Sequence, residues 1–174
     1  MKLLVYYESK DAYIKEFLKA VLSKLRMSGL SIGILGLIFS YLAYRDHSLL
    51  LAGLLLAAGF ISIFVGIFVL PMTFKEFKGQ EEKSTGGENQ VMIRFLEDRA
   101  EIHQGKSHLE IAYDYIERVY PTESLYIFQL GKNTGFYVPK EALNERNRED
   151  FRFLLEEGPL AKLPKKPRGF FSNK

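Results

Sequence analysis

The sequence contains no cysteine among its 174 residues. Disulfides, iron–sulfur clusters and thiolate zinc sites are therefore excluded. It also lacks the short motifs that mark common enzyme chemistries: a nucleophile elbow, a phosphate-binding glycine loop and a pair of histidines at helical spacing. We therefore expect a protein without enzymatic activity and without a cofactor.

Positive charge is scarce between residues 88 and 157. Residues 88–157 contain fourteen acidic residues and nine lysines or arginines, a balance of −5, although the net charge of the whole chain is +3. A domain that binds nucleic acid has the opposite balance, because it must neutralise phosphates. The charge pattern therefore predicts no nucleic-acid partner.

Charge is absent altogether from two long apolar runs. Residues 27–44 carry no charge over eighteen positions, and residues 49–72 carry none over twenty-four. As helices rising about 1.5 Å per residue the runs would reach about 27 and 36 Å, and the hydrocarbon core of a bilayer is about 30 Å thick. We therefore expect a two-helix transmembrane hairpin over residues 27–72, with the lipid bilayer as a partner.

Lysines and arginines near the two runs predict the orientation of this hairpin. Eight of them flank its two ends, whereas the turn between the runs contains only Arg45. Because basic flanks resist translocation, we expect a two-pass membrane protein with both termini in the cytoplasm. The eight are Lys10, Lys15, Lys19, Lys24, Arg26, Lys75, Lys78 and Lys83.

Small residues follow one face of each run. Such stripes let two helices approach closely in lipid, and the short turn favours an antiparallel pair. The alternative is that glycine is simply common in membrane helices. Neither run contains an ionisable residue, so we expect no ion or proton path within the hairpin. The predicted packing residues are Gly29, Gly33, Gly36 and Ser40 in the first run, and Ala52, Gly59, Ser62 and Gly66 in the second.

The segments before and after the two apolar runs show the hydrophobic periodicity of strands and amphipathic helices. Residues 3–7 predict a strand, and residues 10–26 predict an amphipathic helix that lies either at the membrane interface or against a soluble domain. After a polar linker at residues 73–89, alternating apolar residues predict about six strands, and residues 140–157 predict a helix. The expected fold class is a membrane α-helical hairpin plus an α+β cytoplasmic module, in which an antiparallel sheet is capped by a C-terminal helix.

The expected divisions of the chain are residues 1–26, 27–72, 73–89, 90–158 and a basic tail at 159–174. The pattern leaves open whether residues 3–7 join the C-terminal sheet. If they do, both ends of the chain belong to one folded unit.

Four segments of the C-terminal half carry a family likeness. They are FLEDRAEI at residues 95–102, IAYDYIERV at 111–119, GFYVPKEAL at 135–143 and FRFLL at 151–155. With the two apolar runs before them, they resemble the YcxB-like family of small bacterial membrane proteins. The resemblance implies a compact pleckstrin-homology-like (PH-like) module of sheet and helix, and a location in the bacterial inner (plasma) membrane. It implies no particular activity and no functional residues.

One candidate metal site lies near Gly105. If the hairpin there pairs His103 with His108, Glu101 pairs with Glu110 and all four side chains share a face of the sheet. Two imidazoles and two carboxylates suit a divalent ion such as zinc. The alternative is an ordinary polar surface on the solvent side of the sheet, with no metal.

The basic tail is a candidate lipid contact. It has no acidic residue, and each basic residue near an anionic leaflet adds about 1 kcal/mol of attraction. The alternative is a solvated, unstructured end. The candidate residues are Lys162, Lys165, Lys166 and Arg168.

The sequence thus favours a non-enzymatic bacterial membrane protein whose cytoplasmic PH-like module binds a protein or lipid partner at the membrane surface. An alternative is an accessory or immunity-type subunit that acts on another membrane protein through its transmembrane hairpin. A third is a metal-dependent enzyme that uses the face of Glu101, His103, His108 and Glu110. A membrane-associated protein partner and a homo-oligomer are both compatible with these patterns.

Overall fold

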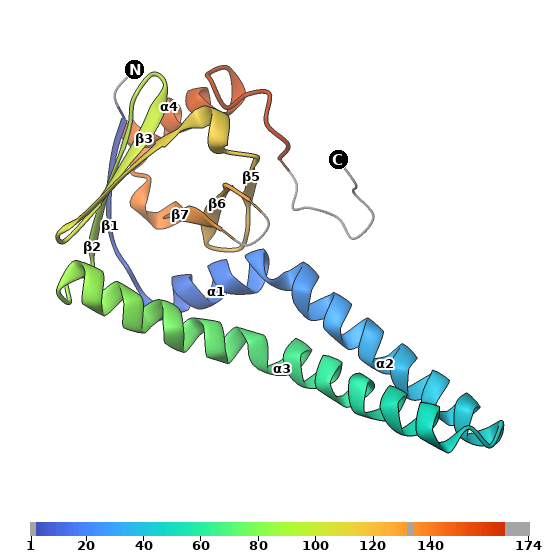
Figure 1. The fold of residues 1–174 in the computed structure, drawn as a ribbon. Coiled ribbons are helices and arrows are strands. Elements are labelled where there is room, and N and C mark those ends of the chain that lie inside the picture. The colour runs from blue at the N-terminus through green and yellow to red at the C-terminus, as the bar shows by residue number, and fades with distance from the viewer. Residues whose placement is uncertain (1–2, 132–133, 166–174) are drawn as a thin grey trace. The chain divides into compact units, whose positions relative to one another are not determined.

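The computed structural model describes residues 3–131 and 134–165, and the chain divides into two compact units (Figure 1). The hairpin unit is Leu22–Thr73, and the sheet unit combines Met1–Val21 with Phe74–Lys174. The sheet unit is therefore built from segments on both sides of the hairpin in the sequence.

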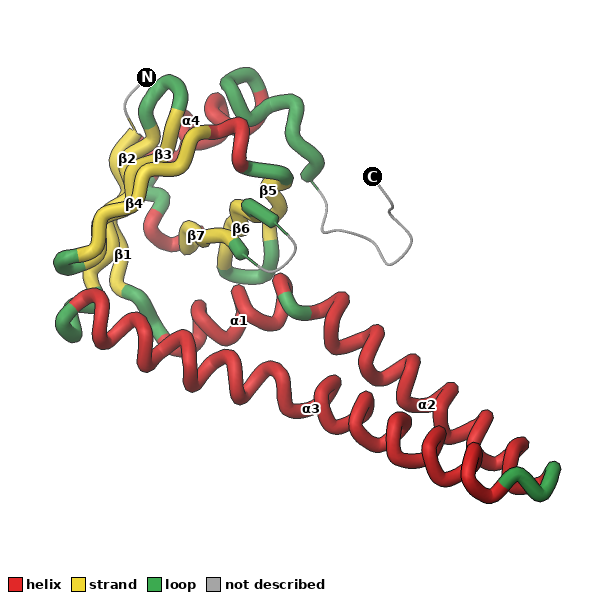
Figure 2. Tube along the Cα trace, in the orientation of Figure 1, coloured by secondary structure: helices red, strands yellow, loops and turns green. Residues whose placement is uncertain are grey.

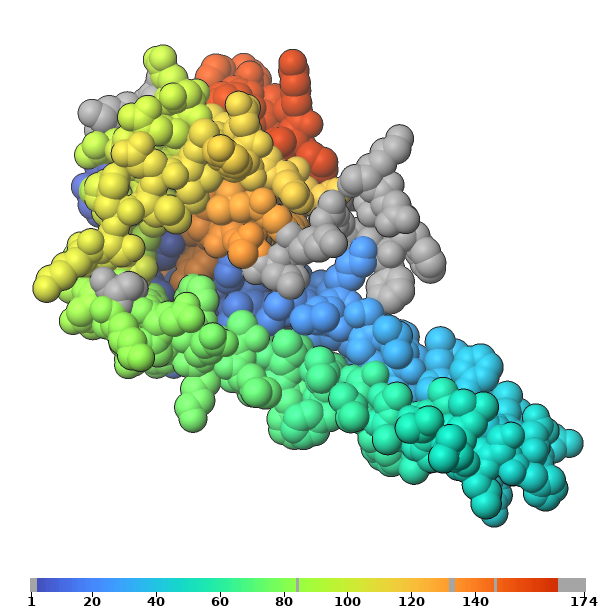
Figure 3. All heavy atoms as spheres, in the orientation of Figure 1, coloured from blue at the N-terminus to red at the C-terminus, as the bar shows by residue number. Residues whose placement is uncertain are grey.

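Two long helices form the hairpin unit and lie along each other (Figure 3). α2 (Ser23–Arg45) ends in a short turn where His47 has a φ of 60°, and the chain returns in α3 (Leu49–Thr85). Among the described residues, these are the two helices long and apolar enough to cross a membrane. Large apolar side chains exposed on them include Ile32, Ile34, Leu35, Phe39, Leu50, Leu54, Phe60, Ile61, Phe64 and Ile67.

Within the described residues, seven strands form two antiparallel sheets in the sheet unit (Figure 2). The first sheet has the strand order β1-β2-β3-β4, and the second has the order β5-β6-β7. The bounds are Leu3–Glu8 for β1, Gln90–Phe95 for β2, Arg99–Gln104 for β3, Ser107–Ala112 for β4, Arg118–Pro121 for β5, Leu125–Gln129 for β6 and Gly135–Pro139 for β7.

The first strand joins the sheet that forms after the hairpin. β1 pairs antiparallel with β2 from Leu3↔Phe95 to Glu8↔Gln90. Leu3 and Val5 are 1% and 0% exposed, because alternate side chains of the strand face the core. The chain therefore leaves this sheet and returns to it at paired residues, with the whole hairpin inserted between them.

The C-terminal helix α4 (Glu145–Glu156) closes the core of the sheet unit. Asn144 caps its start, because its side chain accepts a hydrogen bond from the Asn147 backbone N–H at 2.9 Å. Asn147 Nδ2 in turn donates to the carbonyl of Leu4 at 2.9 Å, which ties the helix to β1. Phe151 of this helix is 2% exposed. The rings packed around it are those of Phe95, Tyr126 and Phe128.

Helix α1 (Asp11–Val21) packs on the second sheet. Its apolar face is buried, and the ring of Phe17 lies 5.4 Å from that of Tyr137 in β7. Glu16 extends from the same helix to the β5–β6 turn, where its Oε1 accepts hydrogen bonds from Thr122 Oγ1 at 2.5 Å and from the Ser124 N–H at 2.9 Å. Of the two interpretations that the sequence allowed, the structure favours a helix packed on the sheet unit.

The Glu16 contacts predict a pH-dependent contribution to stability. Burial raises the pKa of Glu16. The hydrogen bonds from Ser124 and Thr122 and the charge of Lys140 lower it by more than burial raises it, so the pKa of Glu16 is below its ordinary value. A lowered folded-state pKa stabilises the fold above the unfolded-state pKa, and this stabilisation is lost as the pH falls through the folded-state value.

We therefore expect Glu16→Gln to lower the free energy of unfolding by about 1 kcal/mol at neutral pH. The difference from the wild type should shrink as the solution is acidified. Chemical denaturation at neutral and acidic pH measures it, with the exposed Glu149→Gln on α4 as a matched control. An effect of the same size at both pH values would contradict the assignment.

The segment after the apolar hairpin differs from the sequence-based expectation. The predicted linker at residues 73–89 is mostly helix, since α3 continues through Pro71 as far as Thr85. The continuation is held within the sheet unit, where Lys78 Nζ lies 2.9 Å from Asp11 Oδ1 and Lys15 Nζ lies 5.1 Å from the ring centroid of Phe74. The non-helical part of the predicted linker is confined to the residues after Thr85, where Gly86 and Gly87 adopt positive φ.

The strands also divide differently from the prediction. The prediction of antiparallel strands and a C-terminal helix is confirmed, but the strands form two sheets rather than one. The predicted helix at residues 140–157 is a short 3-10 turn at Lys140–Ala142 followed by α4. A β-period pattern specifies which face is buried, but not which sheet a strand joins.

Candidate functional site

The two stripes of small residues meet inside the hairpin unit. Ser40 is buried and its Oγ donates to the Ala52 carbonyl at 2.7 Å. The glycines bring the two backbones into direct contact: a Cβ added to Gly36 would lie 3.0 Å from Cα of Gly59. The contacts across the seam are Gly29 with Ser62 and Gly66, Gly33 and Gly36 with Gly59, and Ser40 with Ala52.

The basic tail is described only in part. Lys166 and Arg168 lie outside the described residues. Lys165 is engaged within the protein, since its Nζ donates to the carbonyls of Leu155 at 2.7 Å and Leu160 at 2.8 Å. Burial lowers the pKa of Lys165, and the charge of Glu156 acts in the opposite direction. The predicted lipid contact by this lysine therefore competes with its contacts near the end of α4.

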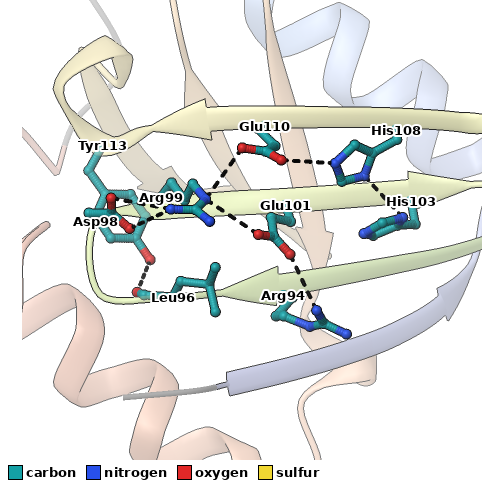
Figure 4. A network of polar contacts seen from close by, with 9 residues as sticks. All are labelled: Arg94, Leu96, Asp98, Arg99, Glu101, His103, His108, Glu110 and Tyr113. Carbon is teal, nitrogen blue, oxygen red and sulfur yellow. Dashed lines mark hydrogen bonds and ion pairs between the residues drawn. The ribbon is translucent and has the colours of Figure 1, made fainter.

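Polar and charged side chains form two rows across the outward face of the first sheet (Figure 4). The strand register places Arg94, Glu101 and Glu110 side by side on β2, β3 and β4. The next row toward the β3–β4 turn contains His103 opposite His108. The sequence-based pairing of these histidines and glutamates is therefore present in the structure.

Two arginines neutralise the facing glutamates. Glu101 is 8% exposed, and its carboxylate contacts both Arg94 Nη1 at 3.4 Å and Arg99 Nε at 3.3 Å. Arg99 Nε also lies 3.4 Å from Glu110 Oε2. The nearby charge of Asp98, together with Glu110 and Glu101, raises the pKa of Arg99 against the opposing effect of burial. Glu101 therefore serves as the centre of a charge network rather than as an exposed ligand.

The two histidines contact each other directly. Their ring centroids lie 4.2 Å apart, and His108 Nδ1 lies 3.1 Å from His103 Nδ1. On its other side His108 Nε2 lies 3.1 Å from Glu110 Oε1. A continuous chain of contacts thus runs from Arg99 through Glu110 to both imidazoles (Figure 4).

Tyr113 anchors one end of this network. It is buried, and its hydroxyl donates to the carbonyl of Leu96 at 2.7 Å (Figure 4). Burial raises the pKa of Tyr113, and the charge of Asp98 adds to the effect. The tyrosine therefore fixes the β2–β3 turn that carries Asp98 and Arg99.

The candidate four-ligand metal site is not formed. Among residues 3–131 and 134–165, no group of three or more histidine, aspartate or glutamate side chains is arranged to hold a metal ion. The physical reason is that Glu101, predicted on the solvent side, is covered by Arg94 and Arg99. Sequence reasoning missed these arginines, although Arg94 and Glu101 occupy adjacent strands at positions that pair.

A cleft of about 200 Å³ opens elsewhere in the sheet unit. One side carries the Gln104 Nε2 to Glu81 Oε1 hydrogen bond of 2.6 Å, and the Tyr7 hydroxyl donates to the Tyr137 carbonyl at 2.8 Å. Burial raises the pKa of Tyr137 to about 12. The apolar lining residues are Phe17, Phe77, Val91, Ile102, Leu109 and Phe136.

A comparison with protein families gives one match in this region. Residues 95–155 match the model of the YcxB-like protein family, so the resemblance predicted from the sequence is confirmed over these residues. Comparisons with curated proteins and with solved structures give no significant match. The matched segment contains most of the sheet unit after β2 and, apart from Arg94, the network around Glu101. It leaves out β1 and the hairpin unit.

Proposed function

Taking the YcxB-like region at residues 95–155 as the premise, we propose that this is a non-enzymatic, two-pass protein of the bacterial inner membrane. The hairpin unit crosses the bilayer twice. The sheet unit is a PH-like cytoplasmic module that binds a protein or lipid partner at the membrane surface.

The pairing of β1 with β2 is the observation that carries this proposal. β1 precedes the hairpin in the sequence and β2 follows it, so one folded sheet requires residues 3–8 and 90–95 on the same side of any membrane. An even number of crossings between them meets that requirement. The excess of lysine and arginine at the two ends of the hairpin, against the single Arg45 in its turn, supports the cytoplasm as that side.

The apolar surface of the hairpin unit supports insertion. Exposed leucine, isoleucine and phenylalanine side chains continue along both α2 and the first part of α3. A soluble protein rarely exposes such a large apolar surface to water, whereas the hydrocarbon core of a bilayer solvates apolar side chains favourably. The backbone of both helices is satisfied internally, as a bilayer core requires.

The arrangement of the sheet unit supports a PH-like binding module. A four-stranded and a three-stranded antiparallel sheet are followed by a C-terminal helix that packs into the shared core. The two segments of this module are joined directly to the two ends of the proposed membrane hairpin, one before it and one after it. The module is therefore held beside the bilayer. A partner at the membrane surface is therefore the kind it meets most often.

The alternative is an accessory or immunity-type subunit that acts through its hairpin on another membrane protein. The small-residue stripes bear on this choice, because the hairpin uses them for its own packing between α2 and α3. A second membrane protein would have to bind other faces. We therefore favour the module as the binding element.

Exchange of the hairpin separates the two functions. In one chimera, residues 27–72 are replaced by an unrelated two-helix anchor, and in the reciprocal chimera only residues 22–73 are kept, between unrelated soluble segments. We expect proteins or lipids cross-linked to the wild type in native membranes to be retained by the first chimera and lost by the second. If the captured partners follow the hairpin instead, the accessory-subunit alternative is correct.

A further inference from the structure

We infer that His103 and His108 form a two-histidine binding site for a borderline divalent cation such as Zn²⁺ or Cu²⁺. Their Nδ1 atoms face each other at 3.1 Å across β3 and β4. Two imidazole nitrogens bound to one tetrahedral zinc at about 2.0–2.1 Å lie about 3.3 Å apart. The two nitrogens therefore already have nearly the separation that a shared ion requires.

Glu110 sets the tautomer that a metal ligand needs. A carboxylate only accepts hydrogen bonds, so the 3.1 Å contact with Glu110 Oε1 places the proton of His108 on Nε2. The lone pair of His108 is then on Nδ1, so His103 Nδ1–H donates the 3.1 Å hydrogen bond between the rings. An ion that binds both Nδ1 atoms replaces this proton, which is released or moves to Nε2 of His103. A histidine that donates its second N–H to a carboxylate is the usual arrangement at metal sites, because it orients the ring and increases its basicity.

The turn beside the histidines is held in place. Gly105 has a φ of 54°, and a Cβ there would overlap the Thr85 carbonyl at the end of α3. Gln104, which precedes it, donates to Glu81 of the same helix at 2.6 Å. These contacts fix the β3–β4 hairpin one residue pair from His103 and His108, so little ordering is required when an ion binds.

The surrounding charge permits a cation at this position. The positive charges of Arg94 and Arg99 are opposed by Glu101, Glu110 and Asp98. Because Glu101 is engaged by both arginines, the described part of the chain supplies two ligands and no third. The remaining coordination positions are open to water, which makes this a partial and accessible site rather than a closed structural one.

Calorimetric titration of the full-length protein with ZnCl₂ or CuCl₂ tests the site. The protein is purified in detergent through a histidine-free tag, in buffer without chelators. We expect one ion per chain, at least tenfold weaker binding for His103→Gln or His108→Gln, and binding about tenfold weaker for Glu110→Gln. The chain has three histidines, so His47→Gln in the turn between α2 and α3 is the matched control and should bind like the wild type.

Two further readouts distinguish loss of the site from loss of the fold. Without metal, the thermal unfolding temperature of the histidine variants should equal that of the wild type, and Zn²⁺ should raise it only in proteins that keep both histidines. The Cu²⁺ complex should show two coordinated imidazoles in its electron paramagnetic resonance spectrum. Absence of binding by the wild type, or binding that survives both substitutions, would overturn the inference and leave the proposed function untouched.

Discussion

Val5→Asp is expected to unfold the sheet unit while the hairpin unit stays helical. Val5 is 0% exposed in β1 and pairs with Ile93, which is equally buried. A carboxylate there would be buried without a partner, and such changes cost about 4–5 kcal/mol, a large part of the stability of an ordinary domain. The measurement is limited proteolysis of the full-length protein, where cleavage should appear throughout residues 90–160.

The matched control is Tyr6→Asp on the neighbouring position of the same strand. Tyr6 is 62% exposed because it lies on the opposite face of β1. Its substitution should leave the sheet unit resistant to protease. Equal resistance of Val5→Asp and the wild type would mean that β1 does not complete the sheet, and the argument for a shared side of the membrane would fail with it.

Gly33→Leu is expected to separate the two helices of the hairpin unit. A Cβ on Gly33 would overlap Cγ1 of Ile63 and lie 2.9 Å from the Gly59 carbonyl. A backbone carbonyl cannot move aside as a side chain can, so overpacking here should cost about 3 kcal/mol or more of helix–helix stability. Unfolding of the detergent-solubilised protein in increasing mole fractions of SDS measures the loss.

Gly53→Leu provides the comparison within the same unit. A Cβ on Gly53, in α3, would have no atom within 4 Å other than those of its chain neighbours and the nearby backbone of its own helix. The substitution changes the same residue type by the same volume in an uncharged stretch of helix, yet it should leave the SDS midpoint unchanged. A similar loss of stability in both variants would show that leucine perturbs these helices wherever it is placed, rather than through the seam.

The hairpin could be predicted from the sequence because its signals are local. A membrane-length run needs only the absence of charge, and the stripe from Gly29 to Ser40 repeats at helical spacing. Strands β2 to β7 likewise follow alternating apolar residues between turn signals. Elements specified by short-range patterns were thus found close to their observed positions.

Features that depend on distant pairing could not be predicted. Val5 and Ile93 pair across more than eighty residues, and no local pattern encodes their register. The same limit explains why the division into two sheets was missed. The error at residues 73–89 has another origin: the polar composition of this segment predicted a linker, but contacts such as Lys78 with Asp11 within the sheet unit hold the helix together.

The face of Glu101, His103, His108 and Glu110 shows the same contrast between local features, which the sequence predicts, and distant pairing, which it does not. The pairing of His103 with His108 followed from the turn at Gly105, which is a local feature. The burial of Glu101 did not, because it requires Arg94 from the preceding strand and Arg99 from its own. Charge pairs on adjacent strands can be predicted only after the strand register is known.

The most direct test of this account is the sidedness of three single-cysteine variants. The chain has no cysteine, so each of three substitutions introduces a single label site. They are Tyr6→Cys in β1, Asp46→Cys in the turn between α2 and α3, and Lys106→Cys in the β3–β4 turn. In intact bacterial cells an impermeant maleimide should label Asp46→Cys, and it should label the other two only after permeabilisation. The account would be contradicted if Asp46→Cys were labelled from the same side as Lys106→Cys. It would also be contradicted if Tyr6→Cys and Lys106→Cys were labelled from opposite sides.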